Sequence, residues 1–218
     1  MKPHYQGKKS SFSSELRKDV QQYFENRQIG KHGNPQLHIT SLLLLIVYIG
    51  LAITLFMPSI LFNPATYLLI CGLLGILTLP LVLNIGHDAV HNTFTSGRKA
   101  NALAQQIFLI LGTSPYFWKL RHIHSHHAFS NVQGWDKDIE QDDVIRLTSE
   151  VPRKKQHKLQ HIYMPLVFCF YTLNWFFYRD FKDLFTKNFG AKKVDYHPAR
   201  QWLKLLLAKA IMIFYLIL

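Results

Sequence analysis

The sequence is short of cysteine, of acidic residues and, over one long stretch, of any charge. Only two cysteines occur among its 218 residues, Cys71 and Cys169, so a disulfide framework is excluded and two free thiols buried in apolar segments are expected. Asp and Glu total 13 against 25 Lys and Arg, for a formal net charge of +12. The basic residues are scattered between apolar segments without a stacking motif, so the charge does not predict a nucleic-acid partner.

No Asp, Glu, Lys or Arg lies between Lys31 and Asp88. An uncharged run of about 55 residues is too long for one core helix and accommodates two bilayer crossings of about 20 residues each. The spans are predicted at Leu42–Phe62 and Tyr67–Ile85, joined by turn-forming residues at 63–65. We therefore expect an all-α integral membrane protein that begins with a transmembrane helical hairpin.

The segment before the first span is basic and largely polar, so it is not a secretory signal. Under the positive-inside rule, this segment and the end of the second span both face the cytoplasm. Residues 13–26 are predicted to form a short amphipathic helix that lies on the membrane surface, packs beneath the site or binds a partner. The expected organisation is a cytosolic segment at 1–38 followed by a multi-pass membrane domain at 39–218.

Three later apolar segments are harder to assign. Residues 102–118 are short and contain Gly112 and Pro115, which favours an interfacial segment over a span. Residues 162–178 reach only the lower limit for a span and precede a basic stretch, so an in-plane or re-entrant helix is expected. Residues 202–218 predict a further membrane helix in which the sequence stops, and we expect the chain to be incomplete there.

Two histidine clusters lie at the end of the second span and about thirty residues later. His87 and His91 are four residues apart, as are His122 and His126, with His127 beside them. Histidines four apart on a helix share a face and can direct two neutral imidazoles at one metal. Five imidazoles exceed the number in a structural zinc site and predict two metals or a larger redox site in a cytosolic cap. The spacing alone does not name the metal.

Other polar residues near these clusters have more than one interpretation. His124 points away from its neighbours on a helix, so it is not predicted as a ligand. Asp136 and Asp138 stand in an acidic loop that is either solvated, in contact with a basic partner, or used to orient ligand imidazoles. Asp88 is a further candidate for orienting a ligand. His161 is retained as a candidate beside the metal, although no third partner is visible near it.

Five short motifs resemble those of one known family. The sequences GHDAVHN at 86–92 and RHIHSHHAFSN at 121–131, the latter running into GWDKDIE at 134–140, are similar to the first two histidine boxes of the membrane fatty-acid desaturases. The sequences QHIYMP at 160–165 and TLNW at 172–175 resemble the bacterial acyl-lipid and linoleoyl-CoA branch of that family. Paired boxes at this spacing after an apolar hairpin are specific to the family.

The resemblance covers about 12–218 and implies a site. Family ligand positions are matched by His87, His91, His122, His126 and His127. His124 matches a position that is not a ligand in the family. The implied cofactor is a nonhaem centre of two iron ions, which uses O2 to form a cis double bond in the acyl chain of an acyl-CoA or acyl-lipid. The implied reductant is an external donor of the ferredoxin or cytochrome b5 type.

One departure from the family pattern concerns the end of the sequence. Family members carry a third box of the form HxxHH or QxxHH after later membrane helices, and this sequence has none. Residues 39–218 are therefore interpreted as an incomplete desaturase domain, and the 218 residues alone are expected to bind iron weakly and to be inactive.

Two other classes of protein remain open from the sequence. A sister diiron hydroxylase or ketolase would use the same boxes, and a membrane zinc-binding protein without enzymatic activity would use the same ligands. Against zinc, a hydrolase should place a general base such as Glu beside its ligands, and a transporter should bury polar ligands at mid-membrane. These clusters are predicted at the membrane edge. A non-catalytic fragment that binds partners or nothing is a third possibility.

Overall fold

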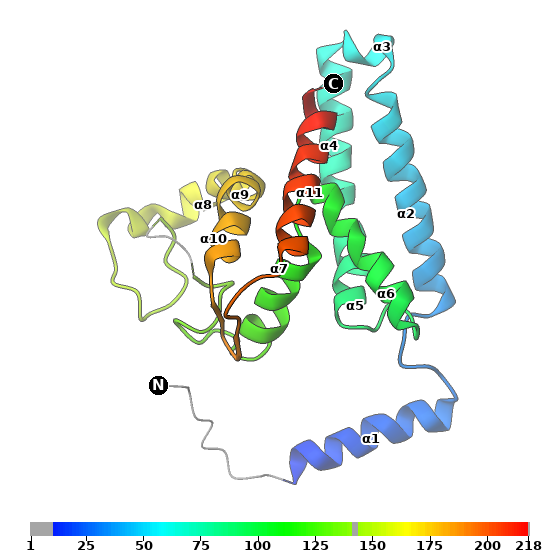
Figure 1. Ribbon diagram of the computed structural model, residues 1–218, viewed down its shortest axis with the longest axis vertical. Coiled ribbons are helices and arrows are strands. Elements are labelled where there is room, and N and C mark those ends of the chain that lie inside the picture. The colour runs from blue at the N-terminus through cyan, green and yellow to red at the C-terminus, as the bar shows by residue number, and fades with distance from the viewer. Residues whose placement is uncertain (1–10, 141–143, 218) are drawn as a thin grey trace.

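The computed structural model describes residues 11–140 and 144–217, which are mostly helical, as predicted (Figure 1). The sheet within this part of the chain is one antiparallel pair of two-residue strands, β1 (Asn188–Phe189) and β2 (Lys192–Lys193). This pair was not predicted, because two-residue strands are too short to show an alternation of polar and apolar residues.

Two long apolar helices, α2 (Pro35–Thr54) and α4 (Pro64–Leu81), lie side by side (Figure 1). Each begins with Asn followed by Pro, and the Asn63 side chain accepts a hydrogen bond from the Thr66 N–H, an arrangement that favours helix initiation. The predicted turn at 63–65 was therefore misplaced. The connection runs through 55–63 and includes a short helix, α3 (Pro58–Leu61).

The apolar side chains of these helices are largely exposed. Leu43 is 57% exposed, Leu69 63% and Ile76 71%. Among the described residues, Pro35–Thr54 and Pro64–Val90 are long and apolar enough to cross a membrane, and few of their residues are buried. A helix of a soluble core would bury such side chains, so this surface is typical of a membrane protein.

The helix that contains α4 changes its winding before it ends. It continues as a π-helical turn, η1 (Val82–His87), and closes with α5 (Asp88–Val90). The same change follows α7 (Pro115–Arg121), which runs into a second π-helical turn, η3 (His122–His126). Regular α-helical geometry was predicted at both places and is wrong there. Single π-helical turns inside α-helices are frequent at functional sites.

The segments predicted as interfacial are interrupted helices. The first consists of α6 (Arg98–Ala104), a 3₁₀ turn η2 (Gln105–Leu111) and α7. It breaks at Gly112, whose φ is +63° and whose Cα lies against Phe176 and Met212. The second consists of a 3₁₀ turn and three helical pieces: η4 (Lys155–Leu159), α8 (Gln160–Cys169), α9 (Tyr171–Asn174) and η5 (Trp175–Arg179).

The last helices bring the C-terminal part of the chain against α7. Phe117 and Leu120 of α7 pack on Leu184 of α10 (Asp180–Phe185), on Phe189 of β1 and on Leu205 of α11 (Ala199–Ile217). This buried apolar cluster fixes the hairpin of β1 and β2 beside the turn that carries the second histidine cluster.

The first helix and the cysteines differ in part from expectation. α1 (Phe12–Arg27) covers the predicted amphipathic segment and lies below the lower end of α2, to which a short linker joins it (Figure 1). None of its side chains is buried against the described part of the chain, and Leu16 is 48% exposed. Cys71 and Cys169 are free thiols, as predicted, but Cys71 is half-buried and Cys169 is exposed.

Candidate metal centre

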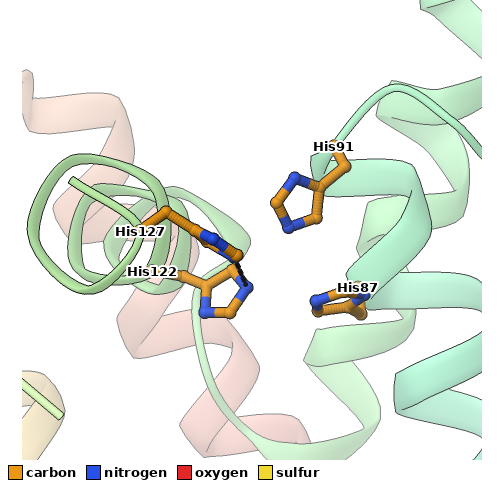
Figure 2. Close-up of side chains that lie close together, drawn as sticks. All are labelled: His87, His91, His122 and His127. Atoms are coloured by element: carbon orange, nitrogen blue, oxygen red, sulfur yellow. Dashed lines mark hydrogen bonds between the residues drawn. The ribbon is translucent and has the colours of Figure 1, made fainter. Parts of the chain in front are cut away.

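Four of the five predicted ligands converge at one point (Figure 2). His87 and His91 come from the end of the α4 helix, and His122 and His127 come from the η3 turn. One ring nitrogen from each lies within 4.8 Å of the corresponding nitrogens of the others. The two sequence clusters therefore form one site, with ring centroids 4.7 Å apart for His91 and His127 and 5.0 Å apart for His87 and His122.

The π-helical winding of η3 decides which histidines face each other. The His127 N–H donates to the His122 carbonyl at 2.9 Å, a bond between residues five apart. In such a turn, positions five apart rather than four apart come together. The Nε2 atoms of His122 and His127 accordingly lie 2.9 Å apart. This pairing was not predicted from the sequence, because α-helical spacing was expected there.

The surroundings of two of these histidines, His91 and His122, favour the neutral, metal-binding form of the ring. Burial lowers the pKa of His122 to about 3, with further lowering by His127 and by His87. Burial also lowers the pKa of His91, as does neighbouring His87. The His91 Nε2 atom is buried and has no hydrogen-bond partner among the described residues. Four converging imidazoles, one of them with an unpaired buried nitrogen, fit a transition metal such as iron or zinc.

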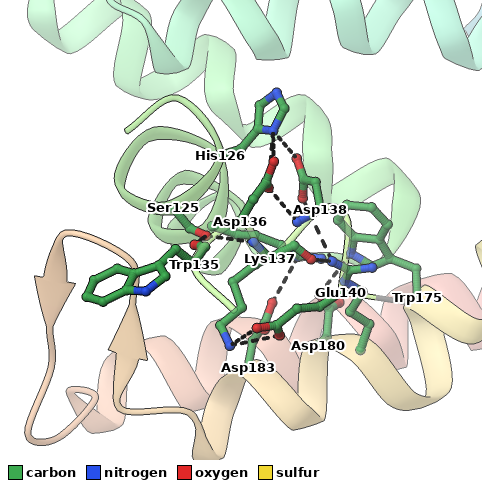
Figure 3. Close-up of polar contacts among 12 residues, drawn as sticks. Ser125, His126, Trp135, Asp136, Lys137, Asp138, Glu140, Trp175, Asp180 and Asp183 are labelled. Carbon is green, nitrogen blue, oxygen red and sulfur yellow. Dashed lines mark hydrogen bonds and ion pairs between the residues drawn. The ribbon is translucent and has the colours of Figure 1, made fainter. Parts of the chain in front are cut away.

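His126, the fifth predicted ligand, lies beside the four and belongs to a second group with Asp136 and Asp138 (Figure 3). Its ring centroid is 5.5 Å from that of His127. Its Nδ1 atom is 3.0 Å from Asp136 Oδ2 and 3.8 Å from Asp138 Oδ2. The carboxylate of Asp136 therefore fixes the orientation of the His126 ring.

Asp136 is fully buried, although it stands in the loop that could have been solvated. Burial alone would raise the pKa of this carboxyl, but the N–H groups of Asn131 and Asp138 donate to it at 2.8 and 2.9 Å, and these bonds together with His126 lower its pKa. The carboxylate stays ionised and accepts hydrogen bonds. This placement matches the interpretation in which it orients an imidazole.

The other predicted candidates fall in different places. Asp88 Oδ1 lies 3.1 Å from His87 Nδ1, so it is positioned to orient that ring. His161 is exposed at the start of α8 and joins neither of the groups that the described residues form. His124 lies outside both groups, with its carbonyl accepting from the Ala191 N–H at 2.7 Å. Its pKa is lowered by burial, then by Lys192 and Lys119.

Two residues near the site were not predicted. The buried Ser125 hydroxyl donates to the Trp135 carbonyl at 2.6 Å and accepts from the Lys137 N–H at 2.7 Å, which fastens the acidic loop to η3. Trp118 stacks on His122 with ring centroids 4.2 Å apart. Trp118 lies four residues before His122, and this spacing was the only sequence signal for it.

An apolar cavity of about 330 Å³ ends at this tryptophan. It lies between α4, η2, α7 and the α9–η5 segment. Its walls include Thr78, Val82, Phe108, Leu111, Trp118 and Trp175. Because Trp118 both lines the cavity and stacks on His122, an apolar ligand in the cavity would lie one side chain away from the histidine cluster.

Comparison with known proteins gives one family and several curated relatives. The family model described as "Fatty acid desaturase" matches residues 61–218. The chain is 28% identical over 171 residues to sn-1 linoleoyl-lipid 6-desaturase of Synechocystis sp., covering 78% of this chain and 47% of that protein. It is 28% identical over 198 residues to the protein of the same name from Arthrospira platensis, covering 90% and 52%.

A third relative is the acyl-lipid (8-3)-desaturase of Physcomitrium patens, 28% identical over 181 residues that cover 82% of this chain and 37% of that protein. The chain thus spans about half the length, or less, of these curated relatives. Solved structures provide no significant match.

Proposed function

Because the chain belongs to the fatty acid desaturase family, we propose that it acts in the O2-dependent desaturation of a fatty acyl chain at a histidine-held diiron centre. One observation carries this proposal above the others: the four-histidine cluster adjoins an apolar cavity, with Trp118 in contact with both. A metal that activates O2 beside a cavity suited to hydrocarbon is the arrangement that oxidation of an unactivated C–H bond requires.

The roles of the chain's own residues follow from their positions. The two irons would be held by His87, His91, His122, His126 and His127. Bound iron would supply the activation of O2 that C–H cleavage needs. Asp88 and Asp136 accept hydrogen bonds from ligand rings and hold them in one orientation. The apolar cavity would exclude water and position the acyl chain.

The substrate and the reductant are part of the proposal. The relatives are named as lipid-linked desaturases, which favours an acyl-lipid over an acyl-CoA substrate. Forming one double bond removes two hydrogens from the chain, and reducing O2 to two waters needs two further electrons and two protons. These electrons would come from an external one-electron donor of the ferredoxin or cytochrome b5 type.

The proposed topology places α2 and α4 as a transmembrane hairpin with the histidines at the cytosolic end. In this arrangement α1 and the interrupted segments 98–121 and 155–179 lie at the interface, and α11 is a further membrane helix. Residues 1–38 form the cytosolic segment and 39–218 the desaturase domain. The basic flanks on the histidine side support this orientation.

Cysteine labelling tests this topology. In a background without Cys71 and Cys169, Ser59→Cys on α3 is expected to react with a membrane-impermeant maleimide only from the outside. Lys193→Cys is expected to react only after the membrane is permeabilised, which gives the reagent access to the cytosolic face. Both positions are exposed, so a lack of reaction would reflect sidedness. Labelling of Ser59→Cys from the cytosol would rule the topology out.

Product analysis tests the activity. The complete gene encoding this chain is expressed in a host that lacks its own acyl-lipid desaturases, and fatty acids are profiled by gas chromatography with mass spectrometry. New cis-unsaturated chains are expected, and their loss in His122→Ala provides the matched control. Hydroxylated chains without new double bonds would instead identify a hydroxylase using the same cluster.

A further inference from the structure

A groove lies between the acidic loop and the hairpin of β1 and β2, next to the histidine-bearing turn. It has a volume of about 370 Å³ and is lined by Gly134, Trp135, Lys137, Asn188 and Gly190. One wall is the acidic loop, which Ser125 ties to η3, and the other is the hairpin of β1 and β2. Figure 3 shows Trp135 beside the hairpin, with its ring directed away from the buried carboxylates.

The hairpin touches the η3 backbone directly. The Ala191 N–H donates to the His124 carbonyl at 2.7 Å. Gly190 has a φ of +54°, and a Cβ at this position would lie 2.6 Å from that carbonyl oxygen and 2.8 Å from Ser125 Cα. Only glycine combines this backbone conformation with this approach. The hairpin that forms one wall of the groove therefore packs directly against the backbone of the ligand-bearing turn.

The rim of the groove is basic. Between Thr186 and Arg200 the exposed basic side chains are Lys187, Lys192, Lys193 and Arg200, against one acidic residue, Asp195. Lys193 pairs with the groove residue Asn188 across the hairpin. Exposed lysines gathered beside a metal centre attract an acidic partner and raise its rate of association.

We propose that this groove and its lysine rim dock the acidic face of a small soluble one-electron carrier protein. The inference rests on the proposed function, because desaturation consumes two electrons that the acyl chain does not supply. Each docking event oxidises one carrier by one electron, so two events and two protons complete the reduction of O2 to two waters. Electron transfer slows steeply with distance, and this groove offers a short path to the histidine turn.

The groove also has the features of a protein-binding surface. Trp135 packs on Phe129 with ring centroids 4.9 Å apart and presents an aromatic wall inside the basic rim. A tryptophan surrounded by charged residues is a common centre of binding energy in protein interfaces. A lipid headgroup would need only the lysines, whereas a protein partner uses both the charge and the aromatic wall.

Direct binding tests the inference without any need for turnover. Protein produced from the complete gene is purified into nanodiscs of neutral lipid and titrated with an oxidised acidic [2Fe–2S] ferredoxin, using biolayer interferometry at about 50 mM salt. Reversing two charges with Lys192→Glu and Lys193→Glu is expected to weaken binding by about tenfold or more. Raising the salt to about 500 mM is expected to weaken wild-type binding as well, because exposed charges are then screened.

The matched control reverses two exposed charges elsewhere. Arg98→Glu and Lys99→Glu change the net charge equally on α6, which Figure 1 places on the opposite side of α4 from α10. This variant is expected to bind ferredoxin within about twofold of wild type. Equal losses in both variants would show that net charge alone attracts the carrier and would overturn the proposal.

Two further outcomes would also overturn it. The first is that the wild type does not bind ferredoxin. The second is that the lysines mediate binding to phosphatidylglycerol vesicles and not to ferredoxin, which would identify a lipid-binding surface. Iron is measured on the same preparations. If iron is present but Lys192→Glu and Lys193→Glu do not weaken ferredoxin binding, only the docking site is rejected. If these changes weaken ferredoxin binding but the wild type holds no iron, the proposed function is rejected.

Discussion

Alanine in place of His87, His91, His122 or His127 is expected to remove most of the iron from protein produced from its complete gene, which should hold about two iron ions per chain. Each substitution deletes one nitrogen from a cluster whose ligand atoms lie within 4.8 Å of one another. A lost ligand leaves an open metal position, and the remaining imidazoles cannot close it because they are fixed on two separate helices.

The comparison with neighbouring residues makes this prediction specific. Asp136→Asn is expected to lower iron affinity by roughly 10–100-fold, because it weakens the bond that orients His126 without removing a ring. His124→Ala is expected to retain iron close to the wild-type level, since His124 lies outside the cluster.

Iron is counted by plasma mass spectrometry after dialysis against chelators of increasing strength. Iron loss in His124→Ala as severe as in His122→Ala would contradict the ligand assignment. Zinc without iron in protein purified from its native membrane would contradict the diiron centre itself.

Lys209→Met is expected to destabilise the protein by about 3–5 kcal/mol. Lys209 is 5% exposed and its Nζ lies 2.9 Å from Asp180 Oδ2, while Asp180 is fully buried. The same carboxylate accepts from Thr113 Oγ1 at 2.9 Å and from Trp175 Nε1 at 3.0 Å. Removing the ammonium leaves a buried carboxylate without its counter-charge, which is far costlier than losing an exposed ion pair.

A double-mutant cycle isolates this pair. Adding Asp180→Asn to Lys209→Met is expected to recover part of the lost stability, because the amide carries no charge to leave unpaired. Lys204→Met, on the same helix but only partly buried, serves as the matched control and is expected to change stability by about 0.5 kcal/mol or less. Unfolding is followed by tryptophan fluorescence in detergent. Simple additivity of the two substitutions would show that the pair does not act as a unit.

The sequence predicted those features that depend on composition and spacing. An uncharged stretch from 32 to 87 suffices to identify two long apolar helices, because no soluble core of this size buries such a run. The two histidine clusters were identified as one site because metal ligands must converge. The structure confirms that the two clusters converge, because the rings of His91 and His127 are in contact.

Features that depend on long-range packing were not predictable. The break at Gly112 is a response to Phe176 and Met212, which are distant in sequence. Lys209 was interpreted from the sequence only as part of an apolar segment, yet it pairs with a carboxylate 29 residues away. The same limit applies to His126, whose place beside Asp136 depends on how the loop is tied to η3 by Ser125.

The π-helical turn at Val82–His87 has a consequence for how this chain can vary in length. Each α-helical residue rotates the side chains by about 100°, and a wider turn in effect inserts one residue. The wider turn therefore separates two properties of this helix. The residues before it decide which face of α4 is apolar, and the number of residues within it decides where His87 and His91 point. Deleting one residue from 82–86 would leave α4 intact and turn both histidines away from His122. Insertions and deletions there should thus be far less tolerated than a substitution of Leu83, the exposed apolar side chain of this stretch.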